Sequence, residues 1–214
     1  MRIKWLGHAC FMLSSANGVR VLTDPFDKSV GYALPEEKAD IVAISHNHFD
    51  HNYVSAVKGS FVRIDRPGTF LEKGIGITGV ATCHDDRGGA KRGPNIVFVF
   101  DIDGLRICHC GDLGHTLTPE QVGKIGNVDV LLVPVGGTYT IDAEEARRVM
   151  RLLKPAVTIP MHYKTPEINF PIDGVDKFLA AAAGTPARRA GAQEVEITRG
   201  NLAGMPEILV LDYK

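Results

Sequence analysis

Short apolar runs separated by glycine, asparagine or charged residues fill the first half of the chain. Runs of this kind, bounded by turn-forming residues, are typical of β-strands. The run at 40–45 is almost wholly apolar and ends in polar residues, which indicates a buried strand. The predicted strands of this half are 3–6, 10–15, 19–23, 40–45, 61–65, 74–82, 95–102 and 105–110, with a short helix at 54–57.

Beyond residue 115, amphipathic segments alternate with apolar runs. Thr118 as N-cap, Pro119 at the first helical position and Gln121 at the third predict a helix over 118–126. Asp142 caps a second predicted helix, 142–154, whose last turn is basic. A third predicted helix covers 173–183, and strands are predicted at 128–135, 155–162, 194–198 and 207–212. This order predicts an α+β fold of packed sheets with helices outside.

Length and composition narrow the class of protein. The 214 residues fit a single domain spanning 1–214. Lys plus Arg number 24 and Asp plus Glu 25, and a net charge of −1 argues against a nucleic-acid or membrane partner. No signal peptide and no apolar run of about 18 residues is recognisable, so the four cysteines are interpreted as reduced thiols. We expect a cytoplasmic protein that acts on a small molecule. Whether it forms a homo-oligomer is left open by the sequence.

Histidines gather in one window directly after the predicted strand 40–45. His46, His48, Asp50 and His51 form an H-x-H-x-D-H array. Residues two apart in extended backbone point the same way, so His46 and His48 can meet at one point, while Asp50 and His51 serve a neighbouring one. Imidazole and carboxylate ligands suit Zn²⁺, Mn²⁺ or Fe²⁺. The alternative is a polar surface loop, but the density of the array favours metal binding.

Three further residues follow other predicted strands, where side chains converge at a sheet edge. They are His84, Asp112 and His162. A single histidine after a strand is more often a hydrogen-bonded structural residue, but the common placement of all three favours a shared site.

These residues, in this order, resemble the motifs of the metallo-β-lactamase fold superfamily over nearly the whole chain. The segments 5–8 (WLGH), 23–25 (TDP) and 136–142 (GGTYTID) narrow the resemblance. They are similar to the branch that holds ascorbate-6-phosphate lactonase-like proteins, related metal-dependent hydrolases and N-acyl-phosphatidylethanolamine phospholipase D. The resemblance implies a four-layer αββα sandwich with a metal site at one edge of the sheets.

The resemblance also implies a role for each motif residue. It assigns His46, His48 and His84 to one metal ion, and Asp50, His51 and His162 to a second, with Asp112 bridging both. Asp24 would support the histidine loop by hydrogen bonds without binding metal. The expected cofactors are two divalent ions, Zn²⁺ first, with Mn²⁺ or Fe²⁺ as alternatives.

A site of this kind predicts a binuclear hydrolase of a small cytosolic metabolite, either a lactone or other ester, or a phosphoester. A metal-bridging hydroxide would attack, and Asp50 and Asp112 would be the catalytic carboxylates, with Asp50 relaying a proton. An iron-dependent oxidoreductase of the superfamily, similar to persulfide dioxygenases, is the alternative. A nuclease is a weaker one, because the compact, near-neutral chain has no evident RNA-gripping insertion. A non-catalytic metal scaffold is weaker still.

Residues with less specific signals complete the prediction. His8, His115, Thr138 and Tyr139 are expected to contact substrate. Three basic residues in the charged loop 84–94 could bind an anionic substrate; they are Arg87, Lys91 and Arg92. A solvent-exposed loop without a binding role would account for their charge equally well. His109, Cys108 and Cys110 are interpreted as structural, because alternation within a strand accounts for their spacing.

Overall fold

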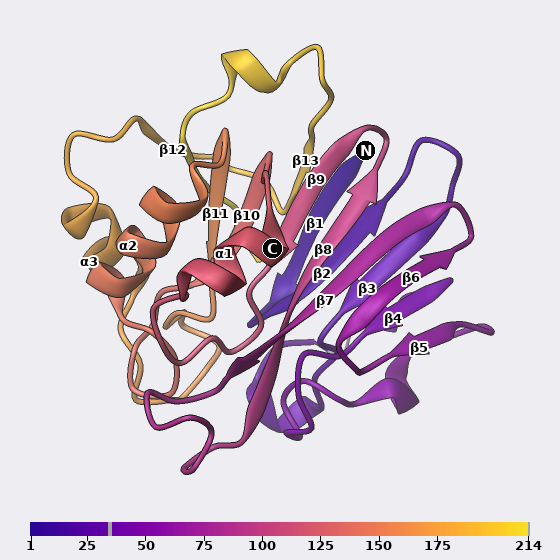
Figure 1. Cartoon of the computed structure of the whole chain (residues 1–214), viewed down its shortest axis with the longest axis horizontal. Helices are drawn as coiled ribbons and strands as arrows, with labels where there is room; N and C mark the ends of the chain where they lie inside the picture. The colour runs from indigo at the N-terminus through magenta and orange to yellow at the C-terminus, as the bar shows by residue number, and fades with distance from the viewer. Residues whose placement is uncertain (34–35, 214) are drawn as a thin grey trace.

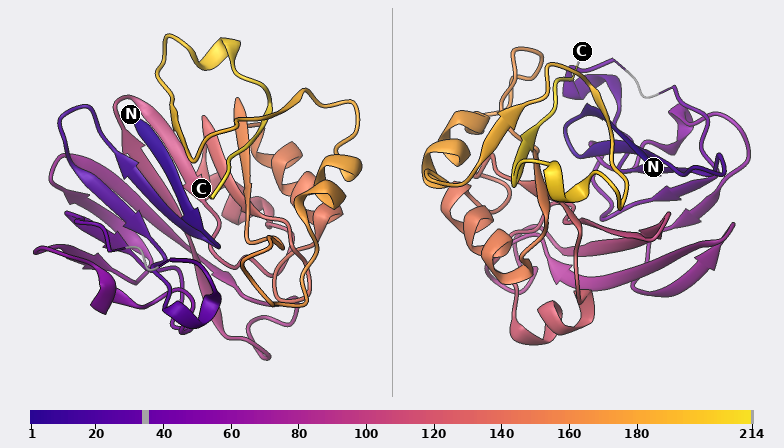
Figure 2. Two further views of the ribbon diagram at one scale, coloured as in Figure 1. Left: turned by 180° about the vertical axis from the view of Figure 1, so that it is seen from behind. Right: turned by 90° about the horizontal axis from the view of Figure 1, so that it is seen from above.

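Two β-sheets pack face to face in the computed structural model, which describes residues 1–33 and 36–213. The first sheet has the order β13-β1-β2-β3-β4-β5 and the second β12-β14-β11-β10-β9-β8-β7-β6. Figure 1 and the rear view in Figure 2 show the N-terminal strands on one side and the helices on the other. The strands of the first sheet are β1 (Arg2–Gly7), β2 (Cys10–Ser14), β3 (Arg20–Thr23), β4 (Ile41–Ala43), β5 (Val62–Ile64) and β13 (Glu194–Glu196).

The second sheet is larger and carries the α-helices. Its strands are β6 (Gly68–Glu72), β7 (Ile75–Cys83), β8 (Pro94–Ile102), β9 (Leu105–His109), β10 (Val130–Pro134), β11 (Val157–Met161), β12 (Ala187–Arg189) and β14 (Ile208–Val210). The helices α1 (Pro119–Ile125), α2 (Ala143–Leu153) and α3 (Val175–Ala181) lie along its outer face. The predicted capping box of Thr118 with Gln121 is present, and the predicted N-cap Asp142 forms a second box with Glu145.

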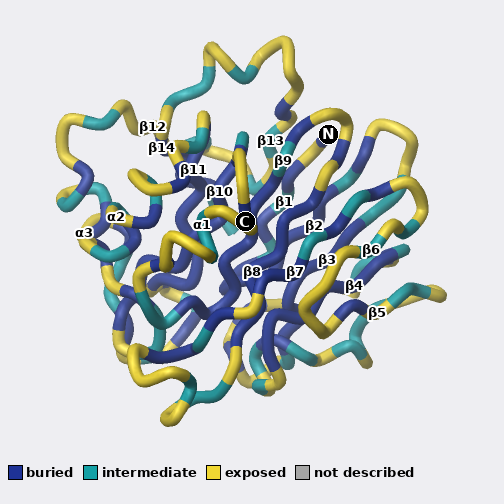
Figure 3. Tube along the Cα trace, viewed as in Figure 1, coloured by how far each residue is buried: buried dark blue, intermediate teal, exposed yellow. Residues whose placement is uncertain are grey.

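Alternation along the strands explains how each sheet buries two faces. In β2, Phe11 and Leu13 point into the core between the sheets, whereas Cys10 and Met12 point to the outer side of the first sheet. There they pack against residues of the loops and of the short 3₁₀ helix η1 (Lys28–Val30). The outer layer of the first sheet is thus made of loops and 3₁₀ turns. Figure 3 shows the central strands of both sheets as buried and much of the edge strand β6 as exposed.

The predicted α+β sandwich is confirmed, with local differences. The predicted helix at 54–57 is one turn of 3₁₀ helix, η2 (Val54–Ala56), and a further turn, η3 (Leu202–Gly204), precedes β14. Strands β6 and β12 were not predicted. The predicted strand at 194–198 returns to the first sheet, where β13 pairs with β1.

Strand directions bring several chain segments to one edge of the sandwich. In the first sheet, β1, β3 and β4 run the same way, because β1–β2 and β2–β3 are antiparallel and β3–β4 is parallel. By the same reasoning β7, β9, β10 and β11 share one direction in the second sheet. The carboxyl ends of parallel strands are where open sheets commonly bind ligands. The loops that follow these strands contain all the residues that the sequence nominated as metal ligands.

Candidate metal centre

The histidine-rich loop after β4 is held by the carboxylate of Asp24, which follows β3. Asp24 Oδ1 accepts the Ser45 amide at 2.7 Å, and its Oδ2 accepts the Ser45 hydroxyl at 2.7 Å. The same Oδ2 lies 3.0 Å from Nδ1 of His51. Asp24 is almost fully buried, and it therefore fixes both ends of the segment that carries the array.

The second sheet contributes its residues around one carboxylate. Asp112 Oδ2 lies 3.2 Å from Nε2 of His84 and 3.2 Å from Nε2 of His162. Its other oxygen, Oδ1, lies 3.2 Å from Nε2 of His51, on the loop from the first sheet. Asp112 is thus the point at which the two halves of the cluster meet.

Glycines beside Asp112 permit this close approach. Gly111 has φ +54°, and a Cβ built there would lie 2.4 Å from Cβ of Ser45. A Cβ on Gly114 would lie 2.2 Å from the carbonyl carbon of His84. Both contacts are shorter than van der Waals separation, so larger residues would push the Asp112 loop away from the loops of His46 and His84.

Ligand atoms converge in three groups, each within 4.8 Å. One group joins His46, His48 and His84, which matches the set that the resemblance assigned to one ion. A second joins Asp50, His51 and His162 and adds His8, and a third joins His46, His51 and Asp112. The structure therefore brings all seven nominated residues together.

Several atoms of this cluster are buried without a hydrogen-bond partner among the described residues. They include Nε2 of His46, Nε2 of His51 and Oδ1 of Asp112, which belong to one converging group. Leaving such atoms unpaired in the interior costs about 1–3 kcal/mol each. Buried nitrogen and oxygen atoms that converge in this way fit a shared cation, and the donor set fits Zn²⁺, Mn²⁺ or Fe²⁺.

Burial sets the protonation of the imidazoles. It lowers the pKa of His46 to about 3, with the neighbouring His51 as the next cause. At neutral pH His46 is therefore uncharged and offers a lone pair, as a metal ligand must. Burial also lowers the pKa of His51, but the carboxylates of Asp112 and Asp50 outweigh it and raise that pKa well above its ordinary value. Without a cation, a proton on His51 balances the carboxylates.

His8 lies inside the cluster, in the turn between β1 and β2. It is fully buried, its ring centroid is 4.0 Å from that of His162, and its Nε2 lies 3.2 Å from Oδ2 of Asp50. Burial and the nearby His162 lower the pKa of His8 to about 4, although the Asp50 hydrogen bond opposes them. A neutral His8 donates from Nε2 to Asp50. His8 does not line the cavity described next, and its expected role as a substrate contact stays a prediction.

A cavity of about 450 Å³ opens onto the cluster. Its size is that of small-molecule sites. Tyr139 lines it, as expected, but Thr138 and His115 do not. Thr138 Oγ1 donates to the Pro171 carbonyl at 2.8 Å, and His115 Nε2 accepts the Cys83 amide at 3.2 Å. The lining consists of Asn47, His48, Phe49, Asp50, His84, Arg92, Asp112, Tyr139, His162 and Phe170.

Phe49 and Phe170 were not predicted for this cavity. Phe49 is 54% exposed, although it is large and apolar. The sequence did contain a signal for Phe49, because this aromatic residue lies between His48 and Asp50 in an otherwise polar array. The sequence gives none for Phe170, which reaches the cavity from a loop after β11 and packs edge-on against Tyr139 with centroids 6.3 Å apart.

His109 has the structural position predicted for it. Its Nδ1 accepts the Gly111 amide at 3.2 Å, so Nε2 carries the proton and donates to the Ala9 carbonyl at 2.8 Å. His109 thereby ties the start of β2 to the segment that leads to Asp112.

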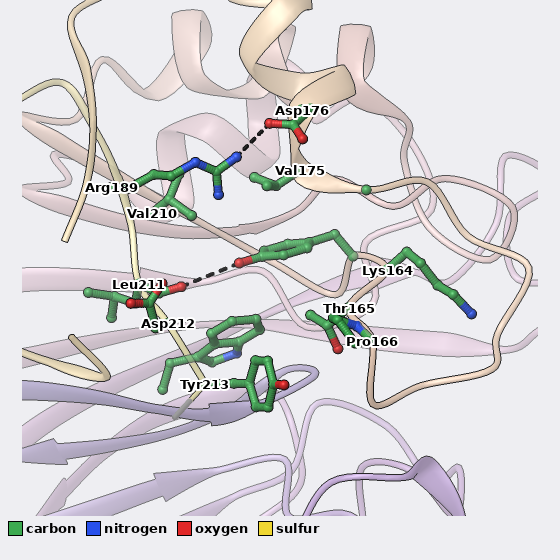
Figure 4. Close-up of a pocket in the computed structure, with 13 residues that line it drawn as sticks. Lys164, Thr165, Pro166, Val175, Asp176, Arg189, Val210, Leu211, Asp212 and Tyr213 are labelled. Atoms are coloured by element: carbon green, nitrogen blue, oxygen red, sulfur yellow. Dashed lines mark hydrogen bonds and ion pairs between the residues drawn. The ribbon is translucent and has the colours of Figure 1, made fainter. Parts of the chain in front are cut away.

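A second cavity, of about 410 Å³, lies near the C-terminus. Figure 4 shows Arg189 paired with Asp176. The Tyr163 hydroxyl donates to the Leu211 carbonyl at 3.4 Å. Its described lining residues include no histidine or cysteine. The first cavity is therefore the candidate for metal chemistry.

Comparisons with known proteins agree with this architecture. A family model described as a beta-lactamase superfamily domain matches residues 2–162. The UPF0173 metal-dependent hydrolase Ta0764 of Thermoplasma acidophilum is 33% identical over 211 residues, covering 86% of this chain and 93% of that protein. Within the described residues, none of the helices has the length and apolar character needed to cross a membrane.

Solved structures show the same fold. A crystal structure from Thermotoga maritima, described as a candidate Zn-dependent hydrolase of the metallo-beta-lactamase superfamily, is 44% identical with a TM-score of 0.81. The match covers 98% of this chain and 97% of that one. A metal-dependent hydrolase candidate from Parabacteroides distasonis, 22% identical, has a TM-score of 0.68 over 85% of this chain and 88% of that one, and supports the fold alone.

Two packed sheets with a histidine and aspartate cluster at one edge define a protein of the metallo-β-lactamase type. The chain belongs to this superfamily and, within it, to the UPF0173 family.

Proposed function

We propose that the protein is a binuclear metal-dependent hydrolase of a small ester, lactone or phosphoester. The observation that carries the proposal is the cluster of buried imidazole and carboxylate atoms, unpartnered and convergent, at the floor of a small-molecule cavity. Relatives described as metal-dependent hydrolases support it.

The residues divide between two positions. His46, His48 and His84 would hold one ion, and Asp50, His51 and His162 the other, with Asp112 shared. Two divalent cations supply Lewis acidity and a nucleophilic hydroxide at neutral pH. Five residues of the cluster line the cavity, so a substrate carbonyl or phosphoryl group can reach it; they are His48, Asp50, His84, Asp112 and His162.

Asp50 would move a proton in this reaction. It lines the cavity, and the donor Nε2 of His8 fixes the direction of its carboxylate. Burial opposes its ionisation, but His51 and the hydrogen bond from His8 outweigh burial and hold the pKa of Asp50 well below its usual value. An ionised Asp50 can accept a proton from the attacking water and return it to the leaving oxygen.

Aromatic rings of the cavity exclude water around the substrate. Phe49, Tyr139 and Phe170 form this part of the lining. A less polar environment strengthens the electrostatic interactions of the cluster with the reacting group.

Elemental analysis of the native protein, purified without added metal or chelator, tests the proposal first. About two equivalents of zinc or manganese per chain, with chelator-sensitive cleavage of p-nitrophenyl esters or phosphoesters, is the expected result. Asp112→Asn should lose most of the metal and activity, whereas Asp176→Asn, which alters an exposed ion pair, should lose neither. One equivalent of iron, without hydrolysis, would overturn the proposal in favour of oxidation chemistry.

A further inference from the structure

Arg92 stands on the wall of the same cavity as His84, Asp112 and His162. We propose that its guanidinium binds an anionic group, a carboxylate or phosphate, that the substrate carries apart from the bond that is cleaved. The inference rests on the proposed hydrolase function and narrows its substrate class.

The backbone of Arg92 is fixed by the residue that follows His84. Asp85 is buried, and its Oδ2 accepts the Arg92 amide at 2.8 Å and the Lys91 amide at 2.9 Å. Its Oδ1 accepts the amides of Arg87 at 2.8 Å and Gly89 at 2.9 Å. Four amides on one carboxylate give the charged loop a definite shape, and this loop supports Arg92.

The side chain of Arg92 is held by the loop that follows β10. Its terminal nitrogen donates to the Thr138 carbonyl at 3.1 Å, and its Cζ lies 5.6 Å from the centre of the Tyr139 ring. Thr138 is itself fixed by its hydrogen bond to Pro171. Stacking on an aromatic ring leaves the edge of a guanidinium free to donate.

The charge of Arg92 has no carboxylate partner within the part of the chain that the structure describes. Its neighbour Arg87 differs, because it pairs with Asp86 at 3.8 Å and is exposed outside the cavity. A guanidinium has five N–H donors, and one of them is used on Thr138. Carboxylates and phosphates match the remaining donors in a two-point geometry. A rigidly held, unpaired cation in a cavity wall thus favours an anionic ligand over a neutral one.

Matched esters test the inference. The substrates are 4-nitrophenyl butyrate, the 4-nitrophenyl monoester of glutaric acid, and the 4-nitrophenyl ester of 4-phosphonobutyric acid. They share a leaving group and a four-carbon acyl chain, and they differ in whether the end carbon of that chain carries only hydrogen, a carboxylate or a phosphonate. The two charged esters therefore distinguish the two kinds of anion. The variants are Arg92→Met, Arg92→Lys and the same-loop control Arg87→Met.

We expect Arg92→Met to raise KM for at least one charged ester about 10- to 100-fold, the range for losing a hydrogen-bonded charge pair. Its kcat should change little, and its KM for the butyrate ester should stay within twofold of the wild type. Arg92→Lys should restore part of the loss, because a lysine keeps the charge but not the planar fork. Arg87→Met should behave as the wild type.

Calorimetric titration of the purified protein with glutarate gives a readout that does not require turnover. Arg92→Met should weaken glutarate binding tenfold or more, and Arg87→Met should leave it unchanged. Equal KM values for charged and neutral esters, or equal effects of the Arg92 and Arg87 variants, would overturn the inference while the hydrolase stands. If metal-loaded wild type cleaves neither these esters nor the p-nitrophenyl phosphoesters, the hydrolase proposal fails, and the glutarate comparison alone decides the role of Arg92.

Discussion

The carboxylate of Asp24 faces Nδ1 of His51 at 3.0 Å, in the interior of the protein. Burial raises the pKa of Asp24, but the hydrogen bond with His51 outweighs it, so this pKa is lowered and the side chain is ionised. An ionised carboxylate can only accept hydrogen bonds. Nδ1 of His51 must therefore carry a proton. When the ring is neutral, the lone pair lies on Nε2, the atom that faces Asp112.

Replacing Asp24 with Asn should weaken metal retention. The amide cannot reproduce both the Ser45 and the His51 hydrogen bonds, so the ring loses its fixed tautomer. Loss of such a supporting carboxylate typically costs 10- to 100-fold in affinity. Dialysis against zinc buffers of known free concentration measures the effect. Asp40→Asn, which alters a carboxylate bonded to the Arg20 amide, is the matched control and should retain metal normally. Equal retention by both variants would contradict the role given to Asp24.

His8 should act through Asp50. His8→Asn tolerates the left-handed backbone, φ 52°, but is too short to reach the carboxylate, so we expect at least a tenfold fall in kcat. His8→Gln can still donate and should recover part of the rate. If both variants instead bind one metal ion fewer by elemental analysis, His8 is a ligand of the second position and not a positioning residue.

His109 should matter for stability and not for metal. His109→Ala removes two buried hydrogen bonds and the edge contact of the ring with Phe11. A fall of about 2–4 kcal/mol in the free energy of unfolding is expected from the cavity and the unpaired groups. Urea denaturation measures it, and His115→Ala, at a half-buried site, should cost about 1 kcal/mol or less. If the His109→Ala variant is folded but has lost all bound metal, His109 is needed for metal binding and its role is more than structural.

Tyr32 should make the protein sensitive to alkali. Burial raises its pKa from 10.0 to about 12, although the hydrogen bond with Thr165 opposes the rise. Between these values the unfolded chain has lost the proton and the folded one has not, so stability falls as pH rises. The contribution is fully present below pH 10 and declines by about 1.4 kcal/mol per pH unit towards pH 12. Urea unfolding at pH 9, 10 and 11 should show a shallower decline for Tyr32→Phe; parallel curves would refute the assignment.

The positions of the candidate metal ligands could be predicted because their spacing is local or tied to strand ends. The His46–His51 array lies within one loop, and His84, Asp112 and His162 each follow an apolar run that becomes a strand. These three strands, β7, β9 and β11, run in the same direction. The cavity lining was harder. Thr138 and Tyr139 are adjacent, yet only Tyr139 faces the cavity, because Thr138 turns its hydroxyl to Pro171. That choice depends on a residue more than 30 positions away.

The missed strands have a similar cause. The edge strand β6 begins at Gly68, and its exposed or half-buried residues show little apolar pattern. It forms because β7 offers a free edge to it. The strand β12 consists of three exposed residues and is set by pairing with β14. Pairing across the chain, and not local propensity, decides such short strands.

The cluster draws His8 and His46 from the first sheet and His84, Asp112 and His162 from the second. An ion held between these residues would cross-link the two sheets, joining positions as distant in the chain as 8 and 162. A disulfide could form a similar cross-link, but a chelator could remove the one made by the ion. Such a cross-link adds about 4 kcal/mol when the free ion stands a thousandfold above its dissociation constant. The cell's metal supply would then govern how long each molecule lasts as well as how fast it works.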